Sequence, residues 1–260
     1  MPSPSARMPH RKRGPSPHLV GIRIDPVALP RGQHPADLPF LAGGPIMLRL
    51  DSPVTVLVGE NGTGKTTLLE AIAARCGIDP RGGTRYRETD EDRPEPPLYP
   101  AVSVEWASFR PPPGLFMRGD TLSEMARRID ERTGPLRMAT DENEWRRLSE
   151  QSRGESVLSL LHSRLDASEG MLMVLDEPET ALSPMRQLSL LALLDAVHQD
   201  GRSQVVMATH SPILMAHPAA RLLSIGDGGI EPADLADLPH WNVMRRFMMD
   251  REGMLARILG

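Results

Sequence analysis

The hydrophobic positions of the chain change period repeatedly, from continuous apolar runs to the three- and four-residue spacing of helices. Three short runs are apolar almost throughout, as expected of strands covered on both faces of a sheet: Val54–Val58, 171–175 and 204–209. A segment with helical spacing or a helix-start signal follows each of them after a short loop. This alternation predicts an α/β fold with a mostly parallel sheet flanked by helices.

Other segments surround this sheet. Residues 18–25 and 46–50 alternate in the manner of edge strands and predict an antiparallel edge region. Two helical segments at 121–132 and 155–165 form a small helical insertion, which spans about 119–168. The remaining predicted elements are strands at 101–107 and 115–117, a hairpin at 221–225 and 228–231, and a last helix at 243–259.

Three stretches are expected to differ from this core. Residues 1–18 are rich in Pro, Ser and Arg and predict a disordered basic tail, which leaves 19–260 as a single domain. Residues 78–100 are polar and interrupted by prolines, which predicts a surface excursion. On the last helix, Arg245, Arg246 and Phe247 could form a docking face, but a half-buried amphipathic helix explains them more simply.

Composition narrows the class of protein. The formal net charge of −4 gives no overall electrostatic reason to bind nucleic acid or an anionic membrane. A single cysteine, Cys76, fits a reducing compartment, and no apolar run approaches the roughly 20 residues that span a bilayer. We therefore expect a cytoplasmic protein without a membrane partner. Its only lysines are Lys12 and Lys65, so arginine is its ordinary cation.

One of these two lysines belongs to the strongest motif of the chain, GENGTGKT, a complete G-x-x-x-x-G-K-[ST] loop between a buried strand and a helix. Its glycines let backbone N–H groups point at phosphate oxygens, its lysine reaches the outer phosphates and its threonine offers a hydroxyl to Mg²⁺. ATP and Mg²⁺ are thus the expected ligands. The predicted nucleotide-binding residues are Gly59, Glu60, Asn61, Gly62, Thr63, Gly64, Lys65, Thr66 and Thr67.

A second candidate site follows the strand at 171–175, which ends on Asp176 and Glu177. Two carboxylates at the edge of a core need partners, because burial of an ionised group is costly. After a P-loop, Asp176 is a candidate ligand of Mg²⁺ through water, together with Thr66. Glu177 is then placed to polarise the water that attacks the γ-phosphate, and it is a catalytic candidate with Lys65.

His210 follows the third buried strand, within Thr209-His210-Ser211-Pro212. One interpretation is that it caps the helix that begins at Ser211 and Pro212. The other places it at the γ-phosphate, because ligands of α/β folds bind at the carboxyl ends of the strands. The two motifs that precede it favour this second, catalytic interpretation.

In this order, the segments VGENGTGKTT, QSRGES, VLDEPETALSP and ATHSPIL resemble the ATP-binding-cassette (ABC) ATPases. The chain is most similar to the standalone bacterial predicted ATPases of the ABC/SMC-like AAA group, and the similarity covers about residues 19–259. The fold that this resemblance implies is the P-loop NTPase fold of the ABC type.

The resemblance also implies a second half of the nucleotide site. Ser152 and Gly154 correspond to the signature motif, which in this superfamily contacts the γ-phosphate held by another protomer. Ser152 as a simple helix cap is equally compatible with the sequence alone. An ATP-dependent, head-to-tail homodimer is therefore the expected assembly, with Leu182-Ser183-Pro184 as a loop that communicates across it.

Two departures from the family pattern concern this site. Arg153 stands where the signature has a small residue. No glutamine follows the strand at 115–117 in the position of the family's Q-loop, so Asp120 is the hypothetical substitute as a metal-binding residue, with an ordinary helix cap as the alternative.

The predicted activity is Mg-dependent hydrolysis of ATP to ADP and phosphate, with dimer closure and opening coupled to an unknown protein partner. The alternatives are an ATP-dependent switch or clamp with negligible turnover, a DNA-repair or defence ATPase, and the nucleotide-binding subunit of a transporter. Charge does not indicate a nucleic-acid partner, but it leaves one open.

Overall fold

The computed structural model describes residues 16–86, 93–109, 111–133, 136–137, 145–146, 152–165 and 170–260. The predicted tail at 1–18 lies outside this part of the chain, except for its last three residues. A seven-stranded sheet forms the centre, in the order β12-β11-β3-β10-β9-β6-β4. In chain order its strands are β3 (Val54–Val58), β4 (Gly83–Thr84), β6 (Gly114–Arg118), β9 (Leu172–Asp176), β10 (Gln204–Ala208), β11 (Arg221–Gly226) and β12 (Gly229–Pro232).

Five neighbouring strands of this sheet, β11, β3, β10, β9 and β6, run parallel, while β12 and β4 add antiparallel edges. All residues of β3, β9 and β10 are buried. Helices or a second sheet cover both faces, so these strands are apolar throughout rather than alternating. The α/β fold with a mostly parallel sheet is confirmed.

A three-stranded antiparallel sheet and α1 (Lys65–Arg75) cover one face of the central sheet. The order of this second sheet is β2-β1-β5, with β1 (Leu19–Ile24), β2 (Ile46–Arg49) and β5 (Val102–Trp106). The prediction that the first strand lies at an edge is therefore wrong, because β1 pairs with a neighbour on both sides. Alternation along a strand shows that one face is buried and says nothing about its neighbours.

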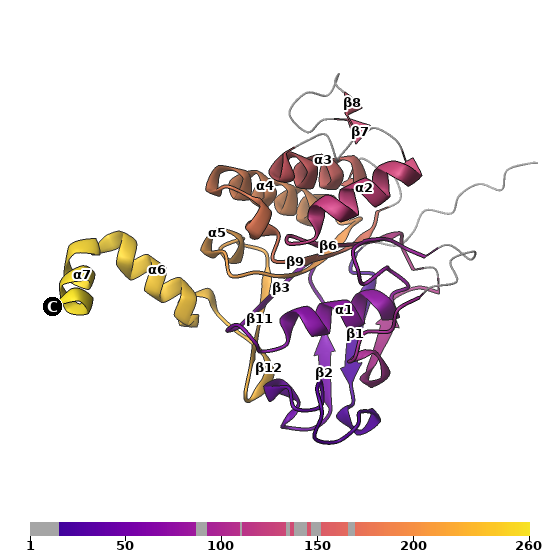
Figure 1. Ribbon diagram of the computed structural model, residues 1–260, viewed down its shortest axis with the longest axis horizontal. Coiled ribbons are helices and arrows are strands. Elements are labelled where there is room, and N and C mark those ends of the chain that lie inside the picture. The colour runs from indigo at the N-terminus through magenta and orange to yellow at the C-terminus, as the bar shows by residue number, and fades with distance from the viewer. Residues whose placement is uncertain are drawn as a thin grey trace, which may run out of the picture.

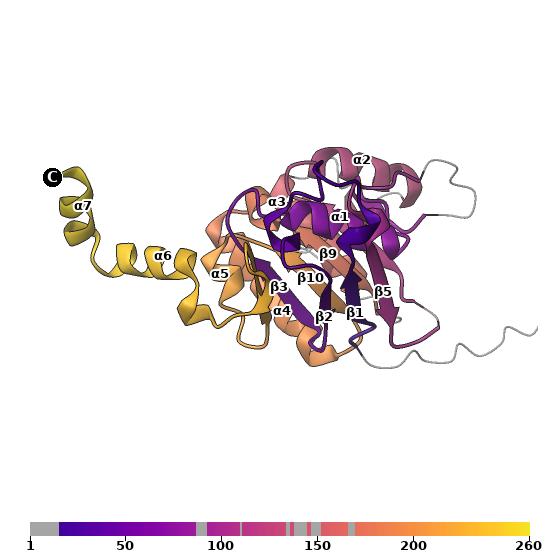
Figure 2. The same ribbon diagram turned by 90° about the horizontal axis from the view of Figure 1, so that it is seen from below.

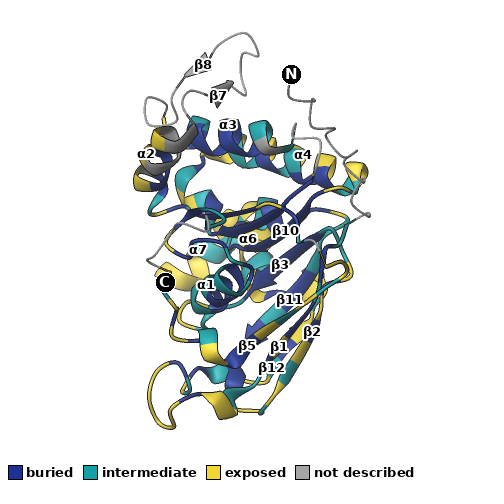
Figure 3. Cartoon of the chain, turned by 90° about the vertical axis from the view of Figure 1, so that its right-hand side faces the viewer, coloured by how far each residue is buried: buried dark blue, intermediate teal, exposed yellow. Residues whose placement is uncertain are grey.

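Three helices form the layer on the opposite face (Figure 1). They are α2 (Leu122–Thr133), α3 (Arg153–Leu165) and α4 (Pro184–Asp200). A short pair of strands, β7 (Leu136–Arg137) and β8 (Trp145–Arg146), lies between α2 and α3 in the chain. The two layers leave the central sheet buried between them, as the band of dark strands in Figure 3 shows. The short helix α5 (Pro212–Met215) follows β10, and the 3₁₀ helices of the described ranges are Pro26–Ala28, Pro39–Leu41, Tyr99–Ala101, Pro178–Ala181 and Leu235–Asp237.

The segment 78–100 is only partly a surface excursion. Ile78 and Leu98 are completely buried, and β4 within it pairs with β6 at the edge of the central sheet. Residues 87–92 lie outside the described part of the chain. The prolines of this segment disfavour an α-helix, but they do not prevent its ends from packing in the core.

The predicted last helix is two helices, α6 (Pro239–Met249) and α7 (Arg251–Leu259). The chain leaves helical geometry at Asp250, with φ −142° and ψ 63°, and the Asp250 carboxylate caps α7 by accepting from the Gly253 N–H at 2.9 Å. Neither helix has a buried residue, and both extend away from the body of the molecule (Figures 1 and 2). The prediction of a half-buried helix is thus wrong. None of the described helices is long and apolar enough to cross a membrane.

Candidate functional site

The loop between β3 and α1 has the backbone of a phosphate-binding loop. Gly62 and Gly64 adopt φ angles of +81° and +94°, a region that side chains disfavour. A Cβ atom at Gly59 would lie 2.5 Å from the carbonyl oxygen of Ile225, so only glycine fits there. These positions explain why the motif needs its glycines, and the loop leads directly into the N-terminus of α1, where backbone N–H groups are free to bind an anion.

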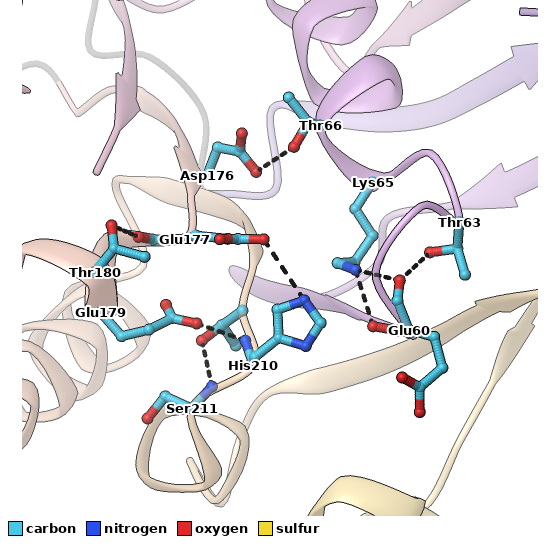
Figure 4. A network of polar contacts seen from close by, with 12 residues as sticks. Glu60, Thr63, Lys65, Thr66, Asp176, Glu177, Glu179, Thr180, His210 and Ser211 are labelled. Atoms are coloured by element: carbon cyan, nitrogen blue, oxygen red, sulfur yellow. Dashed lines mark hydrogen bonds and ion pairs between the residues drawn. The ribbon is translucent and has the colours of Figure 1, made fainter. Parts of the chain in front are cut away.

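Lys65 begins α1 and its side chain turns back across the loop (Figure 4). Its Nζ atom donates to the carbonyl oxygens of Gly59 and Glu60, both at 2.8 Å. Burial lowers the pKa of Lys65, while the carboxylates of Glu177 and Asp176 oppose that change. The ammonium group is therefore held at the phosphate-binding loop by contacts that an arriving phosphate can replace.

Thr66 and Asp176 meet next to this lysine, although 110 positions separate them. The Thr66 hydroxyl donates to Oδ1 of Asp176 at 3.2 Å, and the Asp176 side chain is only 5% exposed. Burial raises the pKa of Asp176 to about 6. A carboxylate in such a place is costly unless a cation or donors balance its charge.

Glu177 is held in an unusual conformation. Among the described residues it is the only non-glycine with a positive φ, at 46°, which is a strained backbone region. Its Oε1 atom lies 3.5 Å from Nε2 of His210. That Nε2 atom is buried and has no hydrogen-bond partner within the described ranges. Burial, followed by the positive charge of Lys65, lowers the pKa of His210, so its ring is neutral at pH 7. The pair faces the P-loop in Figure 4.

The backbone at His210 is fixed by a residue that the sequence did not indicate. The His210 N–H donates to Oε1 of Glu179 at 2.5 Å, and burial raises the pKa of Glu179. Ser211, not His210, caps α5, because its hydroxyl accepts from the Leu214 N–H at 3.2 Å. The His210 ring is thus available for a role at the nucleotide.

Ser152 and Gly154 lie at the start of α3. Ser152 and Glu155 cap this helix reciprocally: the Ser152 N–H donates to Glu155 Oε2 at 3.0 Å, and the Glu155 N–H donates to Ser152 Oγ at 3.4 Å. Arg186 donates to Ser152 Oγ at 2.8 Å and packs where a Cβ atom on Gly154 would be, 2.6 Å from its Nη1 atom. No hydrogen bond or ion pair of the described residues joins this group to Lys65 or to the rest of the P-loop.

Comparison with known proteins identifies the family. Residues 107–216 match the family model described as "AAA domain, putative AbiEii toxin, Type IV TA system", and residues 39–99 match one described as "AAA domain". The "Aliphatic sulfonates import ATP-binding protein SsuB 2" of Rhodococcus jostii is 30% identical over 200 residues, which are 74% of this chain and 76% of that protein. This chain belongs to the ABC-type P-loop ATPases. Membership of this family indicates that the chain binds ATP.

Other similarities agree with this family. A "Putative ATP-binding protein" of Brucella abortus is 26% identical over 199 residues, 71% of this chain. The chain spans 55% of the length of that relative. The structure titled "cbiO1 from clostridium perfringens: Part of the ABC transporter complex cbiONQ" superimposes with a TM-score of 0.51 at 14% identity, covering 93% of this chain and 99% of that one. At this identity the likeness shows the fold alone.

In this ABC-type ATPase, the groups available to a magnesium ion are few. Within the described part of the chain, no three His, Cys, Asp or Glu side chains gather as a metal cluster. Thr66 and Asp176 nevertheless fit Mg²⁺, which keeps several waters and takes phosphate oxygens alongside one or two protein ligands. Asp176 has a raised pKa and a side chain that is hardly exposed. A bound cation would therefore offset the cost of burying its charge.

The fold does not bring the Asp120 carboxylate to Thr66 and Asp176. This carboxylate is 62% exposed and contacts Arg118, at 3.1 Å from Nε and 2.9 Å from Nη2. The same guanidinium donates to Glu70 at 2.6 Å and lies 3.9 Å from Asp176. Arg118 therefore stands beside Asp176 where the sequence suggested Asp120, because β6 and β9 pair with Arg118 opposite Asp176. The metal-binding role of Asp120 has no support from these contacts.

The raised pKa of Asp176 leads to a prediction about how the free energy of unfolding depends on pH. In the unfolded chain an aspartate titrates near 3.8, and in the folded one Asp176 titrates near 6, so the folded state loses stability as pH rises through this interval. Asp176→Asn removes the penalty while its amide oxygen still accepts from Thr66. We expect the variant to be more stable by on the order of 2 kcal/mol at neutral pH and equally stable at about pH 4.

Urea unfolding at both pH values, without nucleotide, measures this difference. Asp120→Asn is the matched control, because it neutralises an exposed carboxylate that contacts the same arginine, Arg118. It should show no such gain at neutral pH. An Asp176→Asn variant that is less stable than the wild type at both pH values would show that burial does not dominate the energetics of Asp176.

Proposed function

We propose that this ABC-type ATPase is a cytoplasmic enzyme that hydrolyses ATP in a Mg-dependent reaction. The observation that carries the proposal is the group around Lys65, in which Glu177 and His210 lie 3.5 Å apart at the carboxyl ends of neighbouring strands. A family member that only held nucleotide would not need a strained glutamate beside the phosphate site.

In the proposed reaction, the P-loop amides and Lys65 bind the β- and γ-phosphates. Mg²⁺, held through Thr66 and Asp176, would neutralise part of the phosphate charge. Glu177 orients a water and accepts its proton as the water attacks the γ-phosphorus, and ADP leaves. His210, neutral and with a free Nε2, donates to or positions the γ-phosphate. Most of the catalysis is positioning and charge stabilisation.

We propose further that two copies close head to tail around two ATP molecules. The support is that, within the described residues, Ser152 and Gly154 form no hydrogen bond or ion pair with the P-loop of their own chain, while α3 presents a helix N-terminus suited to an anion. A second copy would bring this N-terminus to the γ-phosphate. Hydrolysis would then reopen the dimer and pass the change to a protein partner.

The test is complementation between two inactive variants. Lys65→Ala removes the phosphate-binding cation, and Ser152→Asp keeps a good helix cap but places a negative charge against the partner's nucleotide. Each variant alone should be inactive. Mixing them restores one intact site in each mixed dimer, so activity should return to about a quarter of the wild type. Mixtures as inactive as the separate variants would overturn the head-to-tail dimer.

A second candidate function is that of a transporter's nucleotide-binding subunit, which the name of the Rhodococcus jostii relative favours. Such a subunit would need a membrane partner. Purified protein that turns over ATP in solution, and whose two variants complement each other as described above, would exclude this requirement. Co-purification with a membrane protein that stimulates hydrolysis would support it.

A further inference from the structure

Beyond Trp241, which packs against the core, the two C-terminal helices expose apolar side chains that no other described residue covers. We call residues 239–260, which comprise α6 and α7, the C-terminal arm. Figures 1 and 2 show it extending from the body of the molecule. In the described ranges, eleven large hydrophobic side chains are exposed, and six of them belong to the arm: Val243, Met244, Met248, Met249, Ile258 and Leu259. Apolar side chains that gather on one projecting element indicate an interaction surface, and methionines adapt well to such contacts.

The arm begins at the nucleotide site. Leu238, Pro239 and His240 line a small hollow together with Gly59 and Glu60 of the P-loop. His240 Nδ1 lies 3.8 Å from Glu60 Oε1, and the rings of His240 and His210 are 5.1 Å apart between centroids. The arm therefore starts beside the P-loop, and its exposed apolar side chains lie further along α6 and α7, away from the body (Figure 1).

Charge distinguishes the arm from residues 19–238, which form the body of the molecule. The arm has four arginines and two acidic residues, whereas residues 19–238 have 22 basic and 32 acidic residues. Arg245, Arg246 and Arg251 form no ion pair within the described part of the chain. The segment that precedes the arm exposes carboxylates at Asp227, Glu231, Asp234 and Asp237. A basic, apolar arm and an acidic body of the same chain are electrostatically complementary.

We propose that the C-terminal arm packs on a second copy of this chain, with its apolar face on the partner and its free arginines against the partner's acidic body. The inference rests on the proposed dimer, because the arm leaves the chain beside the face at which that dimer would close. The arm would add a contact between the two copies beyond those made through the P-loop and Ser152. Interface cores that combine apolar side chains with arginine are common.

The test uses the full chain with Glu177→Gln, so that ATP is bound and not consumed. Met244→Asp with Met248→Asp puts charge on the arm, and Met47→Asp is the matched control, since Met47 is also exposed, at 63%, but lies on β2. Sedimentation measures the monomer–dimer constant with and without Mg-ATP, and titration with a fluorescent nucleotide measures ATP affinity. We expect the arm variant to dimerise at least about tenfold more weakly and the control to dimerise normally, both with unchanged ATP affinity when the titration is done at concentrations at which the chain is monomeric.

The possible failures are distinguishable. If the arm variant dimerises as well as the control, the arm inference is wrong and the proposed dimer stands. If the chain with an intact arm stays monomeric in both conditions, the arm inference is wrong as well, while hydrolysis by the wild type tests the proposed ATPase separately. A photo-crosslinker at position 248, which is 77% exposed in Met248, should give a species of twice the chain mass. Crosslinks confined to one chain would contradict the proposal.

Discussion

Glu177→Gln is expected to lower kcat for ATP hydrolysis by about 10²–10⁴-fold while ATP binding persists. The amide is nearly the same size as the carboxylate, so the contact with His210 and the strained backbone are kept. It cannot accept a proton from the attacking water. The variant should therefore bind ATP as tightly as the wild type, or more tightly, because it also removes a negative charge beside the phosphates.

Single-turnover hydrolysis together with equilibrium nucleotide binding separates these effects. Glu179→Gln is the matched control, because it makes the same change two residues further along the chain. The Glu179 side chain accepts a hydrogen bond from the His210 N–H and has no proposed contact with the attacking water. A glutamine oxygen can still accept that bond, so kcat should fall less than about tenfold. Equal losses in the two variants would mean that Glu177 is not the base.

The second large effect is expected at Lys65. Lys65→Arg keeps the charge, yet we expect ATP affinity to fall roughly 100-fold, because each charge-assisted hydrogen bond is worth about 1.5–3 kcal/mol and the guanidinium misplaces them. The ammonium group fits between the carbonyl oxygens of Gly59 and Glu60 at 2.8 Å from each, a space that suits a compact cation. A planar fork does not fit there without moving the loop.

Titration with a fluorescent ATP analogue measures the loss. Arg75→Lys, at the other end of α1, is the control: Arg75 contacts the carbonyl oxygen of Tyr99 and no part of the P-loop. Its ATP affinity should not change. If Lys65→Arg binds ATP like the wild type, positive charge alone suffices at this position, and the lysine would have no special role in a chain that otherwise uses arginine.

Local patterns predicted much of this protein. The strand, loop and helix around the P-loop depend on neighbouring residues: β-branched runs for β3, glycines at positive φ, and helical spacing after Lys65. The strand that ends at Asp176 and the strand before His210 were predicted for the same reason. Because parallel strands place their carboxyl ends at one edge of a sheet, the sequence also predicted that these motifs would meet.

The sequence by itself therefore determined the α/β class, the buried strands and the residue types at the nucleotide site. Only the tertiary structure decided what depends on pairing between distant segments. Strand order placed Arg118 opposite Asp176, and the fold brought Glu179 to the backbone of His210. The same limit explains why β1 lies in the middle of its sheet and why the C-terminal arm is exposed. Periodicity shows that a helix has an apolar face, but the surface that covers this face is set by contacts that no local pattern records.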